Sequence, residues 1–93
     1  MKVFIPSELD DLEPDIHRFV DAMVYKLRKN AHKGRWEDLD LPSALRMLRA
    51  EVDELNGALQ ENNQVEILLE CADVANFALI LATIAIEGLK TKE

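Results

Sequence analysis

The segment from Val65 to Ile86 constrains the fold of this 93-residue chain more than any other part of its sequence. Its apolar residues cover nearly every side of a helix, a pattern that is typical of a helix at the centre of a protein. Two acidic residues, Glu70 and Asp73, nevertheless lie near its start. Because burying ionised carboxylates is expensive unless a cation neutralises them, this pair requires a physical reason.

A second acidic pair, Glu51 and Glu54, has the same spacing and lies within the preceding predicted helix. Residues three apart share one face of a helix, so each pair presents two carboxylates to one side. A single pair of this kind is usually solvated surface charge, but two pairs on neighbouring antiparallel helices can face each other. Oxygen-rich, negatively charged sites suit hard divalent cations, so we predict one site for Mg²⁺, with Mn²⁺ as the alternative. The predicted ligands are Glu51, Glu54, Glu70 and Asp73.

Helical geometry separates these acids from their neighbours. At about 100° per residue, Asp53 falls on a solvated face, whereas Glu51 and Glu54 point toward protein. A ferritin-like di-iron site is the competing metal hypothesis, but its usual motif places histidine three residues after glutamate. Those positions here hold Glu54 and Asp73. Asn76, three residues after Asp73, extends the same face toward a metal shell or a ligand.

Hydrophobic spacing and helix-end residues predict a single all-α domain. Pro42, preceded by Asp40 and followed by Ser43, marks the start of the second helix. The connection between the last two helices is short, which makes them antiparallel neighbours. The domain spans 1–93, with an arm at 1–13 and helices at 14–33, 43–60 and 65–87.

The aliphatic content of the second half exceeds what a small monomer can cover. A chain of this length buries only part of its surface when it folds alone. Since 48% of the residues are hydrophobic and they crowd into this half, we expect part of the surface to be buried between subunits.

The net charge of −7 argues against general nucleic-acid binding, yet five cations fall between residues 26 and 35. This basic segment is either a solvated helix end that favours cations or a clamp for the phosphates of a small anion. Trp36 follows it directly and either anchors the loop or stacks on a nucleobase. The candidate ligand-binding residues are Lys29, Lys33, Arg35, Trp36 and Asn76.

The sequence also indicates the cellular compartment of the protein. The one cysteine, Cys71, has no partner for an internal disulfide, and the N-terminus lacks a signal-peptide core. The longest uncharged stretch, 74–86, is too short to span a bilayer. We therefore expect a cytoplasmic protein with no membrane partner.

The acidic motif carries a resemblance to a known family. Glu51-x-x-Glu54 followed by Glu70-x-x-Asp73 on two successive helices resembles the MazG-like, all-α nucleoside triphosphate pyrophosphohydrolase superfamily. KGRW upstream and ADVANF after Glu70 are similar to the small, single-domain phage- and integron-type members. The resemblance covers residues 26–88 and does not extend to the first 13 residues.

The resemblance implies an enzyme that hydrolyses a nucleoside triphosphate at the α-phosphate to the monophosphate and pyrophosphate. It implies that the four carboxylates bind Mg²⁺ and that Glu54 or Glu51 orients or deprotonates the attacking water. It also implies a dimer or tetramer in which two helices from each of two chains form a four-helix bundle. Two alternatives stay open, namely a non-catalytic nucleotide- or protein-binding oligomerisation module and a purely structural helical oligomer.

Overall fold

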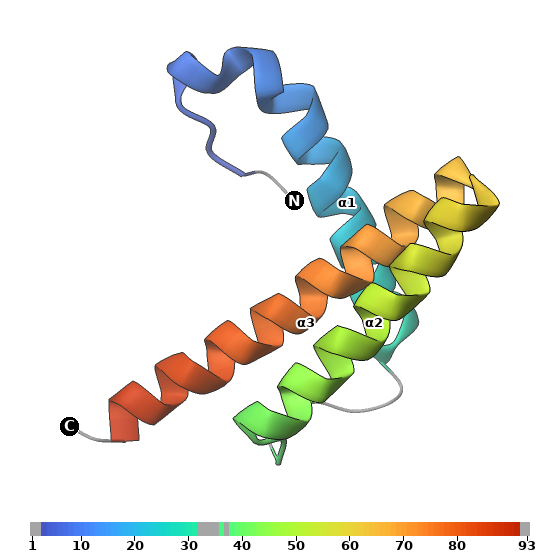
Figure 1. Ribbon diagram of the computed structural model, residues 1–93. Helices are drawn as coiled ribbons and strands as arrows, with labels where there is room; N and C mark the ends of the chain where they lie inside the picture. The colour runs from blue at the N-terminus through green and yellow to red at the C-terminus, as the bar shows by residue number, and fades with distance from the viewer. Residues whose placement is uncertain (1–2, 32–35, 37, 92–93) are drawn as a thin grey trace.

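The computed structural model describes residues 3–31, 36 and 38–91, and this part of the chain is all-helical (Figure 1). The predicted all-α class is therefore confirmed for the described residues. A short 3₁₀ helix precedes three α-helices. In chain order the elements are η1 (Ser7–Leu12), α1 (Glu13–Lys29), α2 (Leu41–Glu61) and α3 (Gln64–Thr91).

Helix α1 begins with Pro14 in its first turn, where the missing N–H of proline costs no helical hydrogen bond. It ends at Lys29 rather than at residue 33, and the N–H of Asn30 bonds to the carbonyls of Lys26 and Arg28. Its last turn is rich in cations, which the helix dipole favours at this end. The last two residues of the predicted helix, 32 and 33, lie outside the described residues.

Polar side chains define the start of α2 and the turn between α2 and α3. The Asp40 carboxylate accepts a hydrogen bond from the Ser43 N–H at 2.8 Å, and hydrogen bonding with the side chain and then the backbone of Ser43 lowers the Asp40 pKa. Helix α2 continues through Gly57 to Asn62, whose φ of 54° is the left-handed conformation that asparagine tolerates at a helix end. Asn63 then caps α3, because its Oδ1 accepts from the Glu66 N–H at 3.1 Å.

Replacing Asn63 by alanine is expected to lower the free energy of unfolding by about 1 kcal/mol, because the first turn of α3 loses its cap. Urea unfolding monitored by circular dichroism measures this loss. Asn56→Ala is the matched control, since Asn56 is exposed inside α2 and its replacement should change stability much less. Equal losses in the two variants would show that the Asn63 cap contributes nothing.

Helices α2 and α3 lie side by side and antiparallel, as predicted, while α1 crosses α3 at a steep angle (Figure 1). The two most buried of the described residues are alanines. Ala44 on α2 and Ala72 on α3 are completely buried, and Ala58 is 7% exposed. Because alanine side chains let helix backbones approach closely, the side chains of α2 and α3 that flank these alanines are brought together.

Helix α3 is central in that it packs against both other α-helices, but much of its apolar surface remains open. Val65, Leu79 and Ile86 are 65%, 41% and 51% exposed. Its 25-residue span Gln64–Gly88 contains an 18-residue window with a mean hydropathy of 1.9, and by length and composition alone it could cross a membrane. The core helix of a soluble protein meets the same criteria, although here only 17% of the tested window is buried.

Candidate functional site

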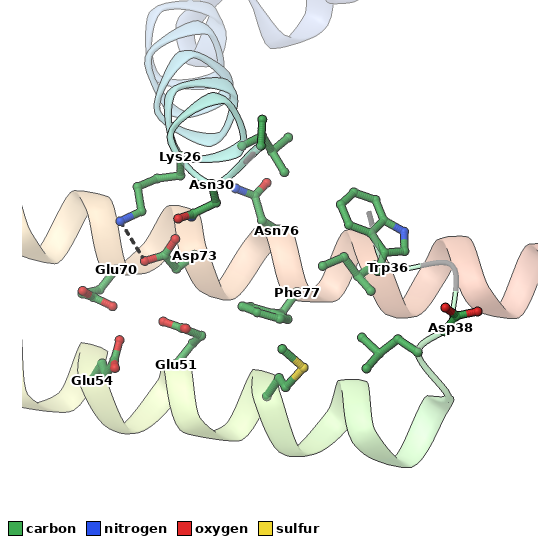
Figure 2. A pocket seen from close by; sticks show the side chains of 15 residues that line it. Lys26, Asn30, Trp36, Asp38, Glu51, Glu54, Glu70, Asp73, Asn76 and Phe77 are labelled. Atoms are coloured by element: carbon green, nitrogen blue, oxygen red, sulfur yellow. Dashed lines mark ion pairs between the residues drawn. The ribbon is translucent and has the colours of Figure 1, made fainter. Parts of the chain in front are cut away.

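A cavity of about 790 Å³ lies where α1, α2, α3 and the segment before α2 meet (Figure 2). Its two ends differ in chemistry. One end is lined by carboxylates from α2 and α3, and the other by apolar side chains. The acidic end contains Glu51, Glu54, Glu70 and Asp73. The apolar end contains Trp36, Leu39, Met47, Phe77 and Ile80, together with one carboxylate, that of Asp38 (Figure 2).

The structure brings three predicted metal ligands to one point. Glu51, Glu70 and Asp73 each offer a carboxylate oxygen, and these three oxygens lie within 4.8 Å of one another. Glu54 projects into the same space between α2 and α3, although its side chain is more exposed (Figure 2). The spacing of each pair on its helix and the close packing of the two helices together produce this convergence.

Two oxygens in this acidic end, Glu51 Oε2 and Glu70 Oε2, are buried and have no hydrogen-bond partner in the described part of the chain. Burial, a hydrogen bond with Glu54 and the charges of Glu54, Asp73 and Glu70 raise the pKa of Glu51 to about 7. Burial also raises the pKa of Glu70, helped by the charges of Asp73 and Glu54. The acids therefore repel one another, and a cation bound among them would relieve that repulsion.

A lysine from α1 reaches into the acidic end. Lys26 Nζ lies 3.1 Å from Asp73 Oδ2, and the two side chains are only 14% and 13% exposed. Burial on its own lowers the Lys26 pKa, but the hydrogen bond and charge of Asp73, with the charges of Glu70 and Glu51, raise it overall. Lys26 thus supplies one positive charge to a cluster that holds several negative ones.

Only some of the predicted ligand-binding residues line the cavity. Trp36 and Asn76 line the cavity, whereas Lys29 is exposed in the last turn of α1 and does not line it. Lys33 and Arg35 lie outside the described residues. Lys26 is one of the five cations between residues 26 and 35, of which we favoured those nearer the loop. Lys26 follows Met23 by three residues and so shares a face of α1 with it, and this apolar neighbour was the signal that Lys26 faces the protein interior.

The raised Glu51 pKa predicts the direction of a pH dependence without added metal. The folded state binds this proton more tightly than an unfolded chain, whose glutamate titrates near 4.5. The free energy of unfolding should therefore fall as the pH rises from 4.5 to about 7, with Glu70 acting in the same direction. Urea unfolding across this range measures the effect, and Glu51→Gln should flatten it. Stability that rises steadily over the same range would contradict the prediction.

Comparisons with protein-family models, with curated proteins and with solved structures give no match to this chain. The function is therefore argued from the geometry and chemistry of the cavity.

Proposed function

We propose that this protein is an Mg²⁺-dependent nucleoside triphosphate pyrophosphohydrolase of the MazG-like type, which converts a (d)NTP to the (d)NMP and pyrophosphate. One observation carries the proposal: a single cavity has three converging carboxylates at one end and an aromatic, apolar lining at the other. A nucleotide has the same polarity, with charged phosphates at one end and a planar base at the other.

The acidic end fits a hard divalent cation. All candidate ligands are carboxylate oxygens, which suit Mg²⁺ or Mn²⁺ better than softer metals. The buried oxygens of Glu51 and Glu70 without partners are the atoms that such a cation would satisfy. Bound Mg²⁺ supplies charge neutralisation and Lewis acidity toward phosphoryl oxygens.

The residues of the chain have separate roles in this proposal. Water attacks the α-phosphorus, the bond from that phosphorus to the pyrophosphate oxygen breaks, and a carboxylate accepts the proton of the water. Glu54 and Glu51 are the candidate bases, and a bound cation would lower the raised pKa of Glu51 and so keep its carboxylate ionised. Lys26 is the described cation placed to offset phosphate charge, and Lys29, Lys33 and Arg35 stay predictions for the outer phosphates.

The other end of the cavity suits a nucleoside. The volume of the whole cavity, about 790 Å³, falls within the usual range for small-ligand sites. Trp36 and Phe77 are two aromatic side chains in the lining, and either ring face can stack on a base (Figure 2).

The exposed apolar surface supports oligomerisation as part of the same proposal. Leu59, Val65 and Ile86 on α2 and α3 are each more than half exposed. A dimer or tetramer that completes a four-helix-bundle core would cover such residues. Sedimentation equilibrium tests this, because a strictly monomeric chain at micromolar concentration would contradict it.

A non-catalytic nucleotide- or protein-binding module is the second candidate function. The Lys26–Asp73 ion pair favours it, because an internal lysine offsets part of the acidic charge without any metal. Such a module would bind a nucleotide or a partner and release no product.

A panel of standard and modified nucleoside triphosphates, assayed for pyrophosphate with Mg²⁺ and with Mn²⁺, separates the two candidates. The enzyme proposal expects pyrophosphate from at least one triphosphate and none when the metal is chelated. Nucleotide binding by calorimetry with no turnover of any triphosphate would support the binding module instead.

A further inference from the structure

Asn76 is the one described polar side chain that is buried in the core and that the proposed hydrolysis does not use. Its residue is 5% exposed, and it stands on α3 one turn after Asp73. Its Nδ2 donates a hydrogen bond to the Met23 carbonyl of α1 at 3.0 Å. Its Oδ1 is buried and has no hydrogen-bond partner among the described residues.

The contact with Met23 fixes which way the amide faces. A backbone carbonyl only accepts hydrogen bonds, so the amide nitrogen must be the atom that meets it. The amide oxygen consequently points away from Met23 and cannot be satisfied by exchanging the two atoms. A buried acceptor left in this state is unfavourable, and a native protein keeps one where a ligand or another group supplies the donor.

The position of this acceptor within the cavity indicates which part of a bound nucleotide would lie beside it. Asn76 and Asp73 are three residues apart on α3, so they are separated by about 4.5 Å along the helix axis. Asn76 lies between the acidic end and Trp36 and is followed by Phe77 (Figure 2). A nucleotide with its phosphates at the acidic end and its base beside Trp36 would place its nucleoside next to Asn76.

We propose that Asn76 Oδ1 accepts a hydrogen bond from the nucleoside part of the ligand, so the site selects nucleotides with an N–H or O–H donor at that point. This inference rests on the proposed function. The shared chemistry is a single donor, which either a base amino group or a sugar hydroxyl can supply. Asn76 is then a specificity-determining residue. Its Oδ1 accepts a hydrogen bond from the ligand, while its Nδ2 donates one to the Met23 carbonyl of α1.

Paired substrates on the unaltered protein test this without relying on a variant that folds. The sugar arm uses nucleotides of one base. It compares the ribonucleoside triphosphate with its 2′-deoxy form, and the 2′-deoxy form with its 2′,3′-dideoxy form. The base arm compares cytosine with pyrimidin-2-one and adenine with purine, each pair differing only in the amino group. Loss of the correct donor should lower kcat/KM by about tenfold or more, in one arm.

Asn76→Leu then connects any discrimination to this residue. It should reduce the discrimination to about threefold or less, while the matched Asn56→Leu variant on the exposed face of α2 keeps it. Turnover with no discrimination in either arm, or discrimination that survives in Asn76→Leu, would overturn the inference and leave the proposed function standing. If Asn76→Leu does not fold, the paired substrates on the unaltered protein decide.

Failure of the proposed function gives a different result. If no triphosphate is hydrolysed, the same pairs are tested as monophosphates by quenching of Trp36, the only tryptophan in the chain. Selective binding of one member of a pair supports the Asn76 inference for a binding module. Absence of binding by every nucleotide overturns both.

Discussion

Replacing Glu51 by glutamine is expected to lower Mg²⁺-dependent pyrophosphate release by at least ~10²-fold in kcat/KM. The side chain keeps its size but loses the charge that would hold the cation beside Glu70 and Asp73. It also loses one of the two carboxylates that could accept the proton of the attacking water. Steady-state kinetics with the best triphosphate of the panel measure the loss.

The same substitution should have an opposite effect on stability without metal. Because neutral glutamine no longer repels Glu54 and Asp73, the variant should melt at a higher temperature than the unaltered protein above about pH 7. Asp53→Asn is the matched control, since Asp53 is exposed on α2 and does not line the cavity. Equal turnover by Glu51→Gln and the unaltered protein would remove Glu51 from the mechanism.

Replacing Ala72 by leucine is expected to lower the free energy of unfolding by about 1–3 kcal/mol and to abolish cation binding. Ala72 is completely buried and precedes Asp73 on α3. A leucine there must push neighbouring helices away, so the carboxylate oxygens that now lie within 4.8 Å of one another would separate. Urea unfolding and Mn²⁺ titration measure the two effects.

Ala78→Leu on the exposed side of α3 makes the same chemical change away from this contact, so it should change neither property appreciably. An Ala72→Leu protein that unfolds at the same urea concentration as the unaltered protein would contradict the close packing described at Ala72. A destabilised variant that keeps full Mn²⁺ affinity would show that this packing does not position the carboxylates.

Periodicity predicted the acidic end of the cavity because the relevant distances are set by helix geometry. Glu51 and Glu70 belong to antiparallel helices joined by a short turn, so the apolar stripes that pack also align the acids. The same reasoning predicted that α3 is the central helix. It did not predict how much of the apolar surface of α3 is exposed. Burial depends on what covers a helix, and one chain covers only part of α3.

The contribution of α1 was harder to predict because it depends on a steep crossing that no local pattern encodes. Lys26 and Asn30 reach the cavity only because α1 lies across α3 at this point (Figure 2). The hydrogen bond from Asn76 to Met23 joins residues that are 53 apart in the sequence. A sequence reading could place Asn76 on the face of Asp73, but it could not show that one end of its amide would be committed to α1.

Cation binding by the acidic end is tested by a calorimetric titration of the metal-free protein with Mg²⁺ and Mn²⁺, beside a variant that combines Glu51→Gln and Asp73→Asn. We expect saturable binding and a raised melting temperature for the unaltered protein, and neither effect for the variant. Equal heats and equal melting temperatures for the two proteins, with and without either metal, would contradict this expectation.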